Sequence, residues 1–380
     1  MQLMVCARVP FITVRRGRRT KYLLSSLSLA HDDKILSPRS LKTTMNCCCD
    51  VGKINCSSRI VTLTTFFLFS SPRLVHPLSP RGKLVHWGLE GLASTTRLVD
   101  SASQFAPHCV LRDKLYRVAL TEQNVAALKK TASLDLCRWM EKDEMDAVLG
   151  SNSLGGLELS CGCRVIHVPS YLEGLYAACQ EMGPIEWRVT HDLHEVAKHE
   201  VVVWAGGAGV LQDGALDQAQ IPIELVRGQS LEMTPSQSGP REAALCGKYI
   251  SPLLDNRMLI GASHEFSEHP MTEVELYKDL REKSYDLAPG LWDDSTIDRV
   301  TCGWRVQSKR GASGRLPIVG HLSQNQWIFT GLSSRGLLYH AIYAEKLSAM
   351  ILAGDNGEAV TKDHLHLNWW RNASKSTIKY

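Results

Sequence analysis

The sequence predicts a two-domain α/β protein in which a β-rich segment interrupts a parallel-sheet domain. Residues 201–205 form a continuous apolar run, typical of a strand buried on both faces of a parallel sheet, and a glycine-rich turn follows at 206–209. Several β-rich stretches lie between residues 221 and 262, and strand and helix patterns return at 299–352. This order predicts domains that are discontinuous in sequence.

Before residue 200 the pattern predicts helices with a few short strands. Apolar residues recur at helical spacing in 84–97, 120–128, 134–140 and 171–180. Ser170 followed by Glu173 has the spacing of a capping box, which predicts that the last of these helices begins there. Short strands are predicted at 157–159, 165–168 and 185–189.

Beyond residue 220 strands dominate the pattern. They are predicted at 221–226, 229–234, 248–252, 258–262, 299–307, 318–320 and 326–330. Residues 255–257 predict a hairpin connection between two of these strands. Two helices are predicted: one at 272–286, where Thr272 and Glu275 again have capping-box spacing, and one at 337–352.

Composition argues against several classes of protein. The chain has 380 residues, a net charge of +4, and 44% hydrophobic and 22% charged residues, which is ordinary for a globular protein of two domains. No dense Lys/Arg block points to nucleic acid, and the longest apolar run, residues 60–69, spans only about half a membrane. Cys161 and Cys163 are too close for a zinc knuckle, so we expect reduced thiols and no metal site.

The first 31 residues differ in composition from the rest of the chain. They contain five arginines, one lysine and several serines, with no acidic residue before Asp32. This composition is typical of a transit peptide and predicts targeting to a plastid or a mitochondrion. The alternative is a disordered basic leader on a cytoplasmic protein.

Three glycine-containing turns are candidate binding elements. The strongest is 329–336, between a strand and a long helix, because glycine backbone can approach an anionic ligand at a helix N-terminus. The turn at 205–209 would let a helix or a cofactor pack closely against the sheet. In 303–305 an arginine at a strand end could hold a carboxylate through two hydrogen bonds. Taken singly, each is more often a packing turn or a surface ion pair.

Together and in order, the segments from residue 71 onward resemble the D-amino-acid-oxidase family of flavoproteins, which includes glycine and sarcosine oxidases. The similar segments are 76–84, 201–209, 227–229, 249–252, 259–265, 303–305, 316–320 and 330–336. The first, HPLSPRGKL, is especially similar to the oxidase half of the bacterial bifunctional enzyme that modifies the wobble uridine of tRNA, and to its plant relatives. The resemblance implies an α/β, FAD-binding, Rossmann-like fold with an inserted antiparallel-sheet substrate domain.

The resemblance also implies roles for individual residues. The residues that match the family's C-terminal flavin-binding turn are Gly331, Leu332, Ser333, Ser334, Arg335 and Gly336. Gly206 and Gly207 match the turn beside the ribityl and diphosphate groups of FAD. Arg305 matches an arginine near the substrate carboxylate, and Tyr249 lies where the substrate sheet faces the flavin. His76 and Lys83 belong to a loop that could line the active site. The alternatives are that Tyr249 is a core residue of the sheet and that His76 is an ordinary loop histidine.

One part of the family pattern has no match. The family begins with a strand, Gly-x-Gly-x-x-Gly and a helix, whereas Gly17 and Gly52 are the only glycines in residues 1–70. We therefore expect the central sheet to lose its middle strand and FAD to lose its main phosphate anchor. The predicted organisation is a leader at 1–70, an FAD-binding region at 71–214 and 303–357, a substrate domain at 215–302 and a tail at 358–380.

The resemblance implies an enzyme that oxidises the C–N bond of a small amine or amino acid with FAD, and then passes the electrons to dioxygen with release of hydrogen peroxide. A rival from another class is a non-catalytic remnant that has lost FAD binding. A third possibility is oxidation of a carboxymethylaminomethyl group carried by tRNA, which ranks lower because no basic face is evident.

Overall fold

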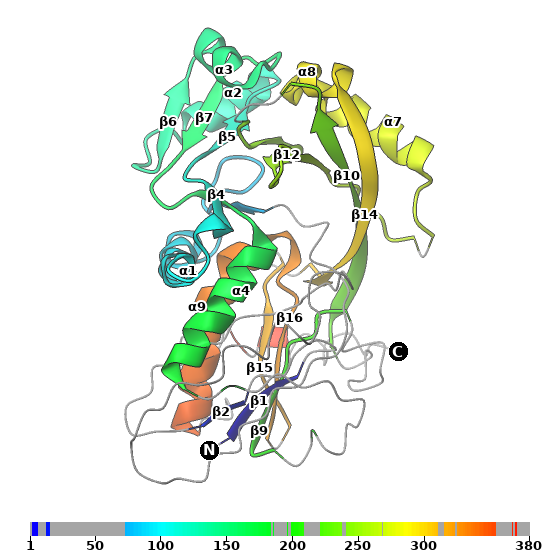
Figure 1. The fold of residues 1–380 in the computed structure, drawn as a ribbon. Coiled ribbons are helices and arrows are strands. Elements are labelled where there is room, and N and C mark those ends of the chain that lie inside the picture. Colours follow the sequence, from blue (N-terminus) through cyan, green and yellow to red (C-terminus); the bar gives the residue numbers. More distant parts are fainter. Residues whose placement is uncertain are drawn as a thin grey trace, which may run out of the picture.

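The computed structural model is built around two large sheets (Figure 1). It describes residues 2–6, 13–15, 73–183, 185, 196, 199–208, 221–237, 241–267, 269–310, 315–323, 325–354, 367 and 369–370. The apolar run 60–69, most of the predicted strand 185–189 and most of the tail lie outside the described residues. No helix in the described part of the chain is long and apolar enough to cross a membrane.

The first sheet has five strands in the order β15–β16–β9–β1–β2. Its centre is the predicted apolar strand β9 (Val201–Trp204), which runs parallel to β16 (Gln326–Thr330) and to β1 (Gln2–Cys6). β15 (Ile318–Ser323) and β2 (Thr13–Arg15) are antiparallel strands at its two edges. The parallel centre confirms the α/β character that the apolar run predicts.

Strand β1 corrects one expectation from the sequence. The sheet does not lose a strand beside β9, because β1 pairs with β9 from Leu3 to Cys6 in parallel. The strand is only five residues long and lies in a basic segment, so neither length nor alternation marks it. The next strand, β2, is antiparallel to β1, whereas a Rossmann unit would continue with a helix and a parallel strand.

Three helices pack together beside this sheet (Figure 1): α1 (Gly88–Ser103), α4 (Val168–Met182) and α9 (Gly336–Ala353). A Cβ at position 91 would lie 2.8 Å from the carbonyl oxygen of Leu338, so Gly91 lets α1 approach α9 closely. The predicted start of α4 at Ser170 is wrong, because His167 is the N-cap and its ring accepts a hydrogen bond from the backbone N–H of Ser170.

The second sheet has eight strands in the order β14–β10–β13–β12–β11–β5–β7–β6. Their bounds are β14 (Ser295–Ser308), β10 (Ile223–Pro235), β13 (Met258–Gly261), β12 (Lys248–Pro252), β11 (Ala244–Cys246), β5 (Leu115–Val118), β7 (Gly156–Leu159) and β6 (Cys137–Met140). The predicted hairpin joins β12 to β13, with Asp255 and Asn256 at positive φ. The predicted boundary between residues 302 and 303 falls inside β14.

Two features of this sheet differ from the sequence-based expectation. The segment 134–140, predicted as a helix, ends in strand β6, and β5 has no counterpart among the predicted strands. Both are four-residue strands that pair with β7, so partners distant in sequence override their local pattern.

The two faces of the eight-stranded sheet pack against different helices. On one face Tyr249, Leu259 and Leu157 share a core with α1, α4 and α9. On the other, Ile250 and Ile260 share a core with α3 (Lys142–Leu149), α7 (Glu273–Ser284) and α8 (Pro289–Asp293). The capping box predicted at the start of α7 is confirmed. The first of these faces, which we call the inner face, therefore looks toward the helices beside the parallel sheet.

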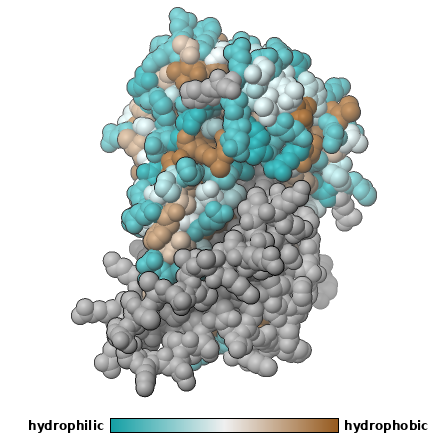
Figure 2. Space-filling view, in the orientation of Figure 1, coloured by the Kyte–Doolittle hydropathy of each residue, from teal (hydrophilic) through white to brown (hydrophobic). Residues whose placement is uncertain are grey.

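The remaining elements are short. They are β3 (Leu74–Val75), β4 (Val110–Arg112), β8 (Arg164–Ile166), α2 (Glu122–Lys129) and the 3-10 turns η1 (Pro107–Cys109), η3 (Tyr285–Leu287) and η4 (Ser333–Arg335). On the face seen in Figure 2 the described surface is mostly hydrophilic, with hydrophobic residues in small separate groups.

Candidate functional site

Two glycine turns lie at the same edge of the parallel sheet. Gly206 and Gly207 follow β9, and 331–336 follows β16; because these neighbouring strands are parallel, both turns are at the carboxyl edge where α/β sheets bind ligands. Gly207 has φ +56° and Gly331 has φ +71°, so both positions favour glycine. A Cβ at Gly207 or at Gly336 would meet no atom of the described residues within 4 Å, so among these residues there is open space beside each turn.

The turn after β16 presents the N-terminus of a long buried helix. Ser333 has a positive φ, and η4 leads directly into α9, which has no side-chain cap at its N-terminal residue Arg335. Such a helix start leaves backbone N–H groups without partners and carries partial positive charge. It suits the electron-rich N1–C2=O edge of a flavin ring.

Arg305 and Tyr249 lie on the inner face of the eight-stranded sheet. Strand register makes Thr301, Ser230, Gly261 and Tyr249 successive neighbours across β14, β10, β13 and β12. Side chains on one face of a strand recur every second residue, so Arg305 shares the face of Thr301. The two predicted substrate residues, more than fifty positions apart in sequence, are therefore on one surface.

The guanidinium of Arg305 is held by backbone and has one nitrogen to spare. Its Nη1 donates to the carbonyl oxygen of Ser263 at 3.4 Å, and its Nε is buried without a hydrogen-bond partner among the described residues. Burial lowers the pKa of Arg305, and the nearby Tyr249 opposes this shift. A free Nε beside Nη atoms is suited to a carboxylate, which binds arginine through two parallel hydrogen bonds.

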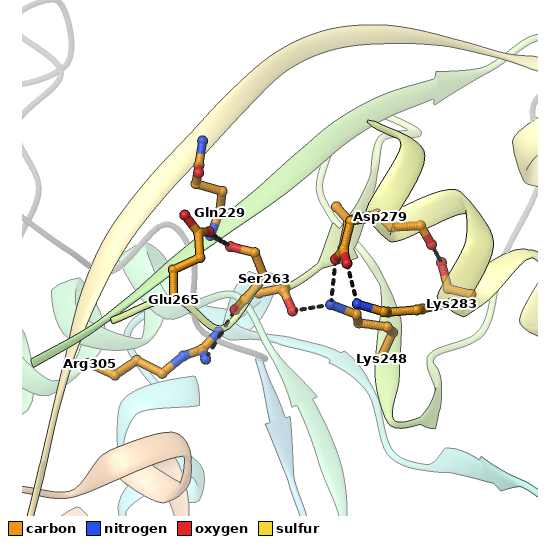
Figure 3. Close-up of polar contacts among 10 residues, drawn as sticks. Gln229, Lys248, Ser263, Glu265, Asp279, Lys283 and Arg305 are labelled. Atoms are coloured by element: carbon orange, nitrogen blue, oxygen red, sulfur yellow. Dashed lines mark hydrogen bonds and ion pairs between the residues drawn. The ribbon is translucent and has the colours of Figure 1, made fainter. Parts of the chain in front are cut away.

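A hydrogen-bonded segment positions this arginine (Figure 3). The backbone N–H of Ser263 donates to the carbonyl oxygen of Gln229, and the backbone N–H of Gln229 donates to the hydroxyl of Ser263 at 2.8 Å. The same hydroxyl donates to the buried carboxylate of Glu265. Lys248 binds the carbonyl oxygen of the preceding residue, Ala262, at 2.8 Å. The carbonyl group that contacts Arg305 is therefore fixed to both β10 and β12.

Tyr249 is buried, with its hydroxyl directed along the inner face. Its Oη lies 3.2 Å from Oγ of Ser230, and a Cβ at position 261 would stand 2.6 Å from Oη, so the phenol lies over Gly261. Desolvation raises the pKa of Tyr249, while Ser230, Arg305 and Arg73 act in the opposite direction. The phenol stays neutral near pH 7 and can donate or accept a hydrogen bond.

The turn 331–336 and the strand of Arg305 are in direct contact. Leu332 forms an isolated β-bridge with Gln307, and the hydroxyl of Ser333 donates to Oε1 of Gln307 at 3.5 Å. Gln307 is two residues beyond Arg305 on β14 and shares its face. The predicted flavin-binding turn thus meets the substrate strand next to the predicted carboxylate-binding residue.

His76 lies near the same turn, whereas Lys83 lies at the surface. Desolvation, together with the smaller effects of Arg117 and Arg335, lowers the pKa of His76 to about 3. The Nδ1 atom of His76 accepts a hydrogen bond from the backbone N–H of Leu78 at 3.3 Å. His76 is therefore neutral at physiological pH. The side chain of Lys83 is exposed.

These residues fit one end of FAD better than the other. The open space at Gly336 and the uncapped start of α9 suit the isoalloxazine ring, and the Gly206–Gly207 turn suits the chain that leads from it. The diphosphate end departs from the family: residues 7–12, which follow β1, contain no glycine. The residues present therefore fit the ring end of FAD alone.

Sequence reasoning missed several residues of this region. Gly228 and Ser263 lie in the family-like segments 227–229 and 259–265, but their local sequence assigns them no role, and no sequence pattern marks Gln307. Arg117 had a visible signal, because it is a charged residue inside the apolar run 115–120. An arginine buried in the middle of a strand calls for a partner.

Comparison with known proteins gives matches of two kinds. The family described as FAD dependent oxidoreductase matches residues 69–350. The tRNA 5-methylaminomethyl-2-thiouridine biosynthesis bifunctional protein MnmC of Nitrosospira multiformis is 30% identical over 161 residues, which are 40% of this chain and 25% of that protein. The chain thus matches about a quarter of the length of this relative.

Solved structures resemble this fold at low sequence identity. Iminodiacetate oxidase from Chelativorans sp. BNC1 is similar with a TM-score of 0.61 and 15% identity, over 78% of this chain and 88% of that one. Glycine oxidase from Bacillus cereus has a TM-score of 0.59 and 15% identity, over 76% and 86% of the two chains. L-proline dehydrogenase from P. horikoshii has a TM-score of 0.59 and 11% identity, over 79% and 86%.

Proposed function

Because the chain belongs to the FAD dependent oxidoreductase family, we propose that it oxidises the C–N bond of a small amine that carries a carboxylate. Membership confirms the family resemblance seen in the sequence, and the solved structures confirm the Rossmann-like fold class. FAD as the bound cofactor, the amine and dioxygen as the electron acceptor are parts of the proposal. Targeting to a plastid or mitochondrion stays a prediction from the leader.

One observation carries the proposal. The inner face places Arg305, with a buried Nε that lacks a hydrogen-bond partner among the described residues, beside a neutral tyrosine and next to the turn at the start of α9. A carboxylate at Arg305 would direct the rest of a small amine toward that turn. Iminodiacetate oxidase and glycine oxidase, which share the fold, are named for amines of this class.

The protein's own contribution is orientation and electrostatics. When bound, FAD would accept a hydride from the carbon next to the amine and later give the electrons to dioxygen, with release of hydrogen peroxide. Arg305 holds the carboxylate, and the hydroxyl of Tyr249 can hydrogen-bond to it. The backbone N–H groups at the start of α9 would stabilise negative charge that develops on a bound flavin ring. The pKa of His76 is lowered to about 3, so its imidazole stays neutral and is a weak base near pH 7.

The test uses the full chain, titrated with FAD and followed by flavin absorbance and melting temperature. Peroxide is then measured with sarcosine, glycine and iminodiacetate, and with ethylmethylamine, which lacks a carboxylate. We expect oxidation of the carboxylated amines alone, and we expect Arg305→Gln to raise KM at least tenfold without changing the flavin spectrum. Arg310→Gln, an exposed residue just beyond the same strand, is the matched control.

Two results would contradict the proposal. Oxidation of ethylmethylamine as fast as of sarcosine would exclude the role of Arg305. A colourless protein whose melting temperature FAD does not raise would favour the non-catalytic remnant, for which the missing diphosphate cradle is the specific support.

A second candidate substrate is a carboxymethylaminomethyl group on tRNA. It is favoured by the match to the tRNA-modifying relative, whose name includes biosynthesis of a modified uridine. Binding of tRNA that weakens steeply as salt rises would support it, since each phosphate contact releases counterions. We rank it second, because the net charge of +4 is small for a protein that binds nucleic acid.

A further inference from the structure

Arg117 is a buried cation that has no acidic partner in the described part of the chain. It lies within β5, and its side chain is only 4% exposed. Neither an ion pair nor a side-chain hydrogen bond reaches its guanidinium from the described residues. Burial lowers the pKa of Arg117 to about 10, which leaves it charged at physiological pH. An isolated buried charge is costly, so a fold that retains one points to an anion that joins it.

One buried carboxylate on the inner face, that of Glu232, is already engaged. Glu232, which is 1% exposed and two residues from Ser230 on β10, pairs with Arg257 at 2.8 Å and with Arg299 at 3.0 Å. This carboxylate is therefore engaged by two arginines and is not free for Arg117. The missing anion must come from outside the described residues.

Arg117 belongs to the same row of residues as Tyr249. It pairs with Leu245 on β11, and Leu245 pairs with Tyr249 on β12, so Arg117 and Tyr249 share the inner face two strands apart. Neighbouring strands are about 4.8 Å apart, which puts their backbones roughly 10 Å from each other. Arg305 lies on the other side of Tyr249, on β14, four residues along the strand from Thr301, which is the β14 member of this row. The inner face therefore has a cation toward each end and a tyrosine between them.

The end occupied by Arg117 also borders the turn 331–336, through Arg335. Arg117 and Arg335 each lower the pKa of His76, and Arg335 lowers that of Arg117, so the three side chains are electrostatic neighbours. Two arginine cations beside a neutral imidazole create a positive potential that attracts an oxyanion. Strand register and burial place this group apart from the Arg305–Ser263 contact.

We propose that Arg117 binds a second oxyanion of the substrate, at the end of the inner face opposite Arg305. This deepens the proposed function and rests on it, because Arg305 is taken to hold the carboxylate near the reacting amine. β5 and β14 are five strand steps apart, roughly 24 Å on a flat sheet and less on the curved sheet of Figure 1. The substrate class is therefore an extended amine acid with a carboxylate or a phosphate at its far end.

The experiment measures binding, not turnover, on the FAD-loaded full chain. The probes are thioether acids in which sulfur replaces the amine nitrogen: one has a neutral alkyl tail, and two have the same tail ending in carboxylate or in phosphate. Calorimetry compares the wild type, Arg117→Gln, Arg117→Lys and the control Arg138→Gln, which changes an exposed arginine of β6 in the same sheet.

We expect the wild type and Arg138→Gln to bind at least one anionic tail tenfold or more tighter than the neutral tail. Arg117→Gln should lose this preference and bind the neutral-tailed probe as before, and Arg117→Lys should keep part of it. A preference for phosphate over carboxylate would indicate a nucleotide-like substrate, and the reverse an amino acid derivative.

Other results overturn the proposal in distinguishable ways. If the wild type binds all three probes equally, the second oxyanion site does not exist, while binding through the common carboxylate leaves the proposed function intact. If no probe binds and FAD is not retained, the second oxyanion site and the proposed function both fail. If Arg117→Gln does not fold, the affinities of the wild type and of Arg117→Lys for the anionic-tailed and neutral-tailed probes still test the second oxyanion site.

Discussion

A Cβ atom at position 228 would stand 2.5 Å from Nη2 of Arg305, so the guanidinium of Arg305 lies across the backbone of Gly228. β10 and β14 pair from end to end, and Gly228 is directly opposite Gly303. The absence of a side chain at Gly228 makes the space that the guanidinium of Arg305 occupies. A glycine on one strand therefore determines where the charge of the next strand lies.

We predict that Gly228→Ala moves Arg305 and weakens binding of carboxylated amines at least tenfold, while flavin binding changes little. The added methyl group cannot coexist with Nη2 at 2.5 Å, so the guanidinium must leave its position. Steady-state KM and calorimetric affinity for a thioether acid measure the effect. Gly290→Ala, where a Cβ meets nothing within 4 Å, is the control, and equal affinities in the two variants would contradict this geometry.

The start of α9 gives a second prediction. Gly336→Ala adds a methyl group where no described protein atom lies within 4 Å, at a helical position. Without FAD the variant should be as stable as wild type or more stable by about 0.5–1 kcal/mol, because alanine favours the helix. FAD affinity should fall, since the open space is proposed to hold the ring. Unfolding by urea and flavin titration give the two values; unchanged FAD affinity would argue against a ring at this turn.

The hydroxyls of Tyr249 and Ser230 should be energetically coupled. They are 3.2 Å apart in a buried setting, so removing either takes this hydrogen bond from the other. Tyr249→Phe and Ser230→Ala should each lower the free energy of unfolding by about 1 kcal/mol, and the double variant should cost less than the sum. A double-mutant cycle from urea unfolding measures the coupling. Strict additivity would show that the bond contributes nothing.

Acidification should destabilise the fold partly through His340. Its Nε2 lies 2.7 Å from the hydroxyl of Tyr171, and desolvation lowers its pKa to about 4. The unfolded state, with a pKa near 6.5, binds more protons between these values, so stability is complete above pH 6.5 and is lost as pH falls toward 4. We expect a loss of about 3 kcal/mol from this residue.

Unfolding free energies at pH 7 and pH 4 test this linkage. His340→Asn should show a smaller difference between the two pH values than wild type, whereas exposed His108→Asn should match wild type. An unchanged pH dependence in His340→Asn would assign the acid sensitivity to other groups, such as His167, whose pKa is also lowered to about 4.

The ion pair of Lys248 and Asp279 should stabilise the segment that holds Arg305. Their atoms Nζ and Oδ2 are 3.0 Å apart, and both side chains are largely buried, linking β12 to α7 (Figure 3). Asp279→Asn leaves a largely buried ammonium without its carboxylate partner and should cost about 2 kcal/mol. Lys248→Met should cost less, because it removes the buried charge itself. For comparison, Arg281→Gln, which breaks an exposed pair, should cost under about 1 kcal/mol by urea unfolding.

Local patterns predicted the elements that local physics controls. The apolar run 201–205, the hairpin at 255–257 and the capping box at Thr272 all depend on residues close together in sequence, and the structure contains each of them. The glycine turns are recognisable for the same reason, since positive φ at Gly207 and Gly331 is a property of single residues.

Strands β1, β5 and β6 were missed or misassigned because each gains its partners from distant segments. A four- or five-residue strand has too few side chains to show a period, and backbone pairing supplies its stability. The wrong start of α4 has a similar cause, since an imidazole at His167 replaces the expected serine cap.

The sequence by itself determined the family, the apolar strand with its glycine turn and the candidates Arg305, Tyr249 and His76. Only the tertiary structure decided that Arg305, Tyr249 and Arg117 share one sheet face, because that depends on the register of six strands. It also decided which charges are matched, since Glu232 binds two arginines and Arg117 binds no described acid. Register and burial are properties of paired strands, and a linear pattern of residues does not contain them.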